Sequence, residues 1–109
     1  MANGNLQVTI PASGVVNLAS GLPSSVKGDI LLQSLTIQNN AAHNMRYGVT
    51  NLVSMTTPAA VNGGAAGFGI LIYPSGSGGI AAFINYTSML SDWWVAGTPG
   101  DVVDVLFIP

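Results

Sequence analysis

The sequence lacks cysteine and glutamate altogether, and only two of its 109 residues are lysine or arginine. Without cysteine the chain can form neither disulfides nor thiolate metal sites. Charged residues make up 6% of the chain, against roughly a quarter in an ordinary soluble domain. Two cations and a net charge of −2 provide no positive field for nucleic acid and no polybasic patch for a membrane surface. We therefore expect neither nucleic acid nor membrane as a partner.

Long hydrophobic runs are also missing, although 49% of the residues are apolar. The uncharged stretch from Tyr47 to Ser91 is interrupted by Pro58, Pro74 and several glycine-rich turns. No window therefore reaches the roughly 18 consecutive apolar residues of a transmembrane helix. The N-terminus has no basic segment followed by an apolar one, so we expect no targeting peptide.

Glycine and proline divide the chain into short segments rich in valine, isoleucine and threonine. This punctuation predicts an all-β fold, a single small antiparallel β-sandwich or jelly roll of about eight short strands. One domain covers residues 1–109, with a short N-terminal arm of about residues 1–5. A helical turn is expected only within residues 87–91, and the apolar run before Tyr73 is expected to be a buried strand. The expected strands are residues 5–10, 15–18, 29–38, 45–49, 68–73, 80–86, 92–96 and 101–108.

Few side chains are suited to acid–base chemistry: one histidine, His43, and the aspartates Asp29, Asp92, Asp101 and Asp104. His43 lies in an asparagine-rich turn, which favours a solvated loop residue. Asp101 and Asp104, with Asp92, are the candidates for a weak calcium site. However, two residues three apart on a strand point to opposite faces, which favours solvated carboxylates. We expect no enzyme, no catalytic residue, no cofactor and no bound metal.

Two adjacent tryptophans, Trp93 and Trp94, are the most informative apolar residues. On a strand one ring must face the core and the other must face outward. We expect Trp93 in the core and Trp94 outside beside Ala96, where it would form an apolar patch for another subunit. The alternative is that a neighbouring loop of the same subunit covers both rings.

The last predicted strand is apolar on both faces and therefore needs two covers. Its core face carries Val103, Val105 and Phe107, and its other face carries Val102, Leu106 and Ile108 around Asp104. The sandwich supplies one cover, and a second subunit can supply the other. Low charge favours the same conclusion, because a free monomer with few charges has poor colloidal stability. We predict a homo-oligomer, with a trimer as the expected state and Trp94, Val102, Leu106 and Ile108 as its interface residues.

A pattern of strands and turns extends over residues 34–108. It comprises Ser34–Asn40, a spacer, Tyr47–Val49, a glycine-rich loop, an apolar strand ending at Tyr73-Pro74, and Trp93–Leu106. This pattern resembles that of small β-sandwich proteins of tailed-phage virions, of which capsid decoration or cement proteins are the nearest kind. The resemblance implies a non-enzymatic structural subunit, commonly trimeric, located in the virion and bound to the major capsid protein or other virion subunits. Because the turns follow general turn chemistry, the resemblance assigns no functional residue.

Two other functions stay open. In a carbohydrate-binding, lectin-like module, Trp93 or Trp94 together with Tyr73 or Tyr86 would stack on sugar rings, and Asp92 would bind hydroxyls. A phage tail component is the other alternative. An enzyme ranks last because acids and bases are so few.

Overall fold

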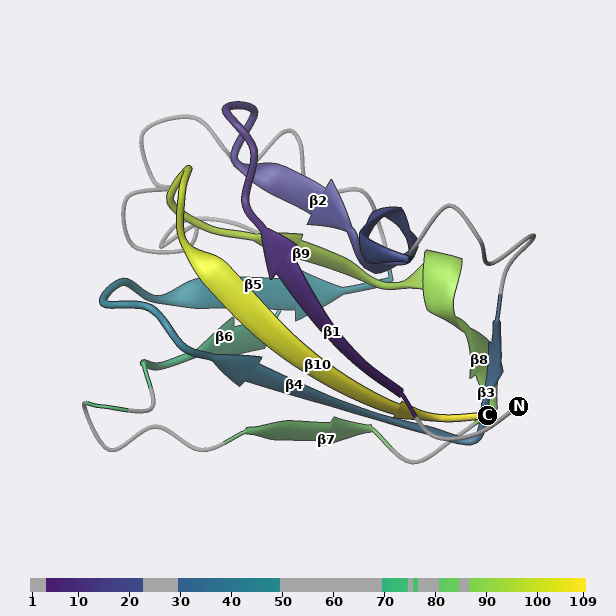
Figure 1. Cartoon of the computed structure of the whole chain (residues 1–109). Coiled ribbons are helices and arrows are strands. Elements are labelled where there is room, and N and C mark those ends of the chain that lie inside the picture. The colour runs from purple at the N-terminus through teal and green to yellow at the C-terminus, as the bar shows by residue number, and fades with distance from the viewer. Residues whose placement is uncertain (1–3, 23–29, 50–69, 75, 77–80, 85–86) are drawn as a thin grey trace.

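The computed structural model describes residues 4–22, 30–49, 70–74, 76, 81–84 and 87–109. This part of the chain contains ten short strands, all paired antiparallel, in two four-stranded sheets and one two-stranded sheet (Figure 1). No helix within the described ranges is long and apolar enough to span a membrane. The first sheet has the order β1(Gly4–Thr9), β10(Val102–Ile108), β4(Ser34–Asn39), β7(Ala82–Ile84). The second has the order β2(Val15–Asn17), β9(Trp94–Ala96), β5(Met45–Gly48), β6(Ile70–Ile72), and β3(Leu31–Leu32) pairs with β8(Ser88–Met89).

The strand pairs are nested along the chain. Strand β1 pairs with β10, β2 with β9, β3 with β8, β4 with β7 and β5 with β6. The chain thus forms one long hairpin that folds over on itself, and the pairings of β10 with β4 and of β9 with β5 complete the two larger sheets. This wrapping of an antiparallel hairpin into two packed sheets is a jelly roll. The predicted fold class is confirmed.

The strands alternate between core and surface as their sequences predict. In β1, Leu6 and Val8 are buried, whereas Asn5, Gln7 and Thr9 are exposed. In β10, the predicted core residues Val103, Val105 and Phe107 are all buried. Because side chains alternate with a period of two, these positions fix which face of the first sheet meets the second.

The core lies between the two larger sheets. Leu35, Ile37 and Val103 of the first sheet and Val95 and Met45 of the second are almost completely inaccessible to solvent. At the edge of the first sheet, the ring of Phe107 packs over Gly4 on the paired strand, so closely that a Cβ at Gly4 would overlap it. Only glycine fits at the start of β1 without displacing the ring of Phe107.

Several boundaries differ from the sequence predictions. Gly4 and Asn5, within the predicted N-terminal arm of about residues 1–5, pair with β10, and residues 1–3 lie outside the described residues. The predicted strand over residues 29–38 divides at Gln33 into β3 and β4, which pair with different partners. Residues 87–91 contain strand β8, and a 3₁₀ turn follows at Leu90–Asp92. A second 3₁₀ turn lies at Leu18–Gly21. These differences raise the strand number from about eight to ten in the described ranges.

Candidate functional site

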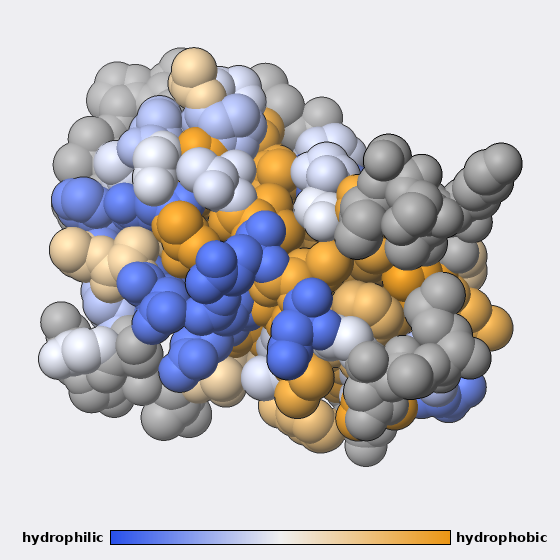
Figure 2. All heavy atoms as spheres, viewed as in Figure 1, coloured by the Kyte–Doolittle hydropathy of each residue, from blue (hydrophilic) through white to orange (hydrophobic). Residues whose placement is uncertain are grey.

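The outer face of the first sheet is the most distinctive surface of the described chain. Across the four strands, Asn5, Leu106, Thr36 and Phe83 form one row, since each is in register with the next. A second row, two residues further along the strands, is formed by Gln7, Asp104 and Gln38. Figure 2 shows hydrophilic residues over the middle of this face with hydrophobic residues between and beside them.

A shallow open depression of about 540 Å³ lies on this face. Its described lining combines polar side chains with apolar surface and includes no lysine or arginine, and its one charged group is the carboxylate of Asp104. The side-chain amide of Asn40 donates a hydrogen bond of 2.8 Å to Oδ2 of Asp104, which fixes the orientation of the carboxylate. The depression is lined by Asn5, Leu6, Gln7, Thr36, Gln38, Ala81, Asp104, Val105 and Leu106.

Phe83 stands beside the depression and is 65% exposed. It lies on β7 opposite Thr36, while its neighbour Ile84 faces the core. Leu106 and Ile108 are also exposed on this face. An exposed aromatic ring and exposed apolar side chains next to hydrogen-bonding groups are typical of a surface that binds a ligand or partner.

The four predicted interface residues lie on two different faces. Val102, Leu106 and Ile108 are on the outer side of β10, where Val102 is half-buried and the other two are exposed. Trp94 is on β9 in the second sheet, where it is half-buried and packs against Val15 and Ala96. They therefore form no single patch, and their role as an interface stays a prediction.

Sequence reasoning missed a second exposed apolar surface, along β5 and β6. Ile70 is 61% and Tyr73 57% exposed, and Val49 is exposed just beyond β5. The apolar run before Tyr73 was expected to be a buried strand, but β6 is the edge strand of its sheet and only Ile72 is buried. The part of that expectation that covers residues 65–69 lies outside the described residues. A uniformly apolar run has no alternation, so its sequence gives no sign of which side faces solvent.

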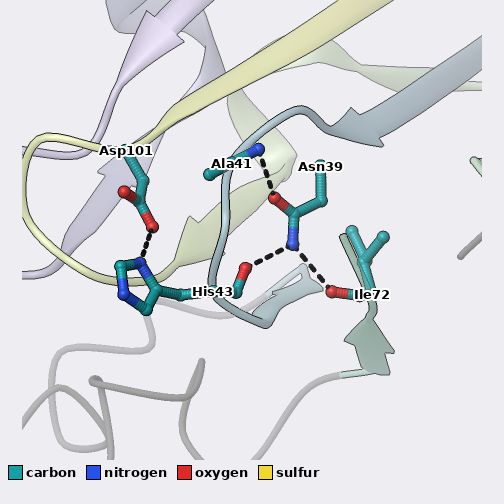
Figure 3. Close-up of polar contacts among 5 residues, drawn as sticks. All are labelled: Asn39, Ala41, His43, Ile72 and Asp101. Atoms are coloured by element: carbon teal, nitrogen blue, oxygen red, sulfur yellow. Dashed lines mark hydrogen bonds and ion pairs between the residues drawn. The ribbon is translucent and has the colours of Figure 1, made fainter. Parts of the chain in front are cut away.

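His43 differs from the predicted solvated loop residue, because it has a charged partner. Its Nδ1 lies 2.8 Å from Oδ2 of Asp101, with the two side chains 42% and 16% exposed (Figure 3). His43 belongs to the β4–β5 turn and Asp101 to the β9–β10 connection, so the pair joins two turns. Nothing near either residue in sequence could have indicated this contact, since 58 positions separate them.

Below this pair, Asn39 fixes the β4–β5 turn from inside. The side chain is 1% exposed, and its Nδ2 donates to the carbonyl oxygens of His43 at 2.7 Å and Ile72 at 3.0 Å. Its Oδ1 accepts a hydrogen bond from the backbone N–H of Ala41 at 3.0 Å (Figure 3). One buried amide thus ties β4, its turn and β6 together.

The aspartates considered for calcium binding have separate partners. Asp101 contacts His43, Asp104 contacts Asn40, and Asp92 accepts from the backbone N–H of Met89 at 2.9 Å. Within the described ranges no three His, Cys, Asp or Glu side chains are grouped as a metal site would need, and Asp29 lies outside those ranges.

The aromatic residues of the lectin-like hypothesis do not form one platform. Trp93 is 4% exposed and its indole N–H donates to Oγ of Ser88, so its ring cannot stack on a sugar. Trp94 pairs with Gly48 at one end of β5, whereas Tyr73 lies beyond the other end, next to β6. Strand spacings place these two about 17 Å apart. Tyr86 lies outside the described residues.

No protein-family model, curated protein or solved structure matches this chain.

Proposed function

We propose that the chain is a non-enzymatic structural subunit of a phage virion, a decoration protein that binds the assembled capsid. It acts as a homo-oligomer, with a trimer as the expected state and the major capsid protein as its partner. The observation that carries the proposal is the combination of exposed apolar side chains with a surface of very low charge.

The exposed apolar residues are large and numerous for so small a domain. Single exposed hydrophobic residues are normal, but groups of them mark interaction surfaces. Val49 and Ile70 lie near one end of the paired strands β5 and β6, Tyr73 lies beyond the other end of β6, and Leu31 and Ile108 belong to strands near the C-terminal end of the chain in Figure 1. With 6% charged residues, the free subunit has little electrostatic protection against association.

The jelly roll is compatible with the proposal without deciding it. Viral capsid proteins and lectins both use this architecture, and a fold by itself does not determine function. The resemblance of residues 34–108 to tailed-phage decoration proteins favours the virion. A subunit that spends its existence in an assembly also needs none of the surface charge that this chain lacks.

The proposed subunit contacts are the apolar side chains that lie away from the depression. Ile70 begins the edge strand β6 and Tyr73 follows its other end, so they provide two separate contacts at this edge, and Trp94 lies on the same sheet two strands away from β6. Ile108 provides a contact at the end of β10. Truncation of such an anchor commonly costs at least about 2 kcal/mol of association free energy.

The test is to mix the purified chain with empty capsids of the major capsid protein from the same source. We expect co-sedimentation that saturates at a fixed number of copies per capsomer, and a native mass measurement that gives a trimer. The double variant Ile70→Ser, Tyr73→Ser should weaken capsid binding or trimer formation, and Thr9→Ser on β1 is the matched control. A chain that stays monomeric at micromolar concentration and does not bind capsids would overturn the proposal.

A further inference from the structure

The depression on the outer face of the first sheet has a chemistry that subunit assembly does not require. We propose that it is a binding site for a neutral oligosaccharide, with Phe83 as the stacking ring and Gln7, Gln38 and Asp104 as the principal hydrogen-bonding groups. This site goes beyond the proposed structural role, because it assigns a ligand to a depression whose lining includes none of the proposed subunit contacts; Ile108 lies on the same face but outside that lining.

The two rows of side chains define an elongated site. The row from Asn5 to Phe83 crosses four paired strands, which gives a length of about 14 Å at the usual strand spacing. The row through Asp104 runs parallel to it, about 7 Å away along the strands. The depression and Phe83 beside it together form an open surface of this length, which suits a short chain of sugar rings better than a single compact ligand.

The polar groups of the lining match sugar hydroxyls. Each amide of Asn5, Gln7 and Gln38 offers donors and an acceptor, and the hydroxyl of Thr36 offers both. A hydroxyl also donates and accepts, so either orientation of an amide finds a partner. The carboxylate of Asp104 only accepts, and its bond from Asn40 holds it in place before a ligand arrives.

Two side chains in the row from Asn5 to Phe83 can make apolar contact with the ligand. Leu106 lies between Asn5 and Thr36, and Phe83 lies next to Thr36 at the outer strand. The C–H groups on one face of a pyranose ring can pack on an exposed aromatic ring. A ring that is 65% exposed, on a strand whose other large residue faces the core, has the freedom to accept such a ligand.

Other classes of ligand fit this lining less well. Phosphates, nucleic acids and acidic sugars need cations, and none of the described lining residues is a cation. A metal ion needs more than the one carboxylate of Asp104. A purely apolar partner would bury the amides and the carboxylate without hydrogen bonds, which is unfavourable for each group.

The test is a titration of the full-length ¹⁵N-labelled chain with maltohexaose, cellohexaose, xylohexaose and mannohexaose, and with oligogalacturonate as the acidic counterpart. We expect saturable shift changes from at least one neutral probe, located on β1, β10, β4 and β7, and weaker or no binding of oligogalacturonate. Phe83→Ala and Gln38→Ala should each lower the affinity roughly tenfold or more. Gln33→Ala removes an exposed amide that lies outside the lining and should leave the affinity unchanged.

Thermal unfolding of each variant shows whether it is folded, which is expected because both substituted side chains are exposed. The proposal is overturned if no neutral probe binds, if the shift changes lie on the second sheet, or if Phe83→Ala and Gln38→Ala bind as the wild type does. It is also overturned if these variants lose trimer formation or capsid binding, because the face is then a subunit contact. Loss of capsid binding in the Ile70→Ser, Tyr73→Ser variant bears only on the proposed function.

Discussion

The buried amide of Asn39 offers the sharpest test of what holds the fold together. In Asn39→Ala the carbonyl of Ile72 loses its hydrogen bond in a buried place, and Ala41 and His43 lose theirs in partly buried ones. An unpaired buried group costs about 1–3 kcal/mol, and an ordinary bond contributes about 0.5–1.5 kcal/mol. We therefore expect a loss of about 3–4 kcal/mol, a large part of the roughly 5–15 kcal/mol that a domain has.

The measurement is urea unfolding monitored by tryptophan fluorescence, since Trp93 is buried in the core. Thermal unfolding should agree, with a decrease in Tm of about 15 °C for a domain of this size. Asn40→Ala is the matched control: the side chain is exposed and makes one bond to Asp104, so it should cost less than about 1 kcal/mol.

A variant that preserves the acceptor separates the two halves of the network. Asn39→Asp retains an oxygen for the N–H of Ala41 but donates to neither carbonyl when ionised. It should therefore be at least as unstable as Asn39→Ala at neutral pH. If Asn39→Ala unfolds at nearly the same urea concentration as Asn40→Ala, the turn does not depend on this amide and the reasoning fails.

Four further predictions concern single substitutions. Trp93→Ala should lower stability by about 3–5 kcal/mol in thermal unfolding. Trp94→Ala should leave the subunit folded and weaken association by about 2 kcal/mol or more in sedimentation, and the reverse pattern would contradict the assignment of the two rings. His43→Ala should cost less than about 1 kcal/mol, because the pair with Asp101 is partly exposed, and a larger loss in denaturant titration would contradict this. Gly4→Ala should cost about 1–3 kcal/mol, since its Cβ would displace the ring of Phe107, and an unchanged Tm would show that the ring moves freely.

The sequence predicted the parts of the fold that depend on alternation within one strand. Val103 and Val105 were assigned to the core and Leu106 and Ile108 to the other side, and the structure agrees. The separation of β3 from β4 within the predicted strand 29–38, and the strand β8, were beyond this reasoning, because β3 and β8 have only two residues each and neither shows a period. These two short strands form because the nested pairing brings residues 31–32 opposite residues 88–89. Neither segment alone has a sequence pattern that predicts this pairing.

The contacts around the candidate site were predictable only as residue types. The pairs His43 with Asp101 and Asn40 with Asp104 join residues 58 and 64 positions apart. Each side chain was visible as a polar group in a turn or on a strand, but its partner depends on which turns meet at the end of the sandwich. That information lies in the topology, and local turn chemistry does not contain it.

Register links the core to the polar row of the depression. A slip of one residue in β10 would bury Asp104 and expose Val103 and Val105, so the alternation that fills the core also places Asp104 outside, between Gln7 and Gln38. Core packing therefore dictates where this row lies, though not that its members are amides. Phe83 is different, because its position opposite Thr36 only requires a residue that tolerates solvent. A large ring that is 65% exposed contributes little to the free energy of folding. Phe83→Ala is therefore the substitution that most directly separates a loss of oligosaccharide binding from a loss of stability.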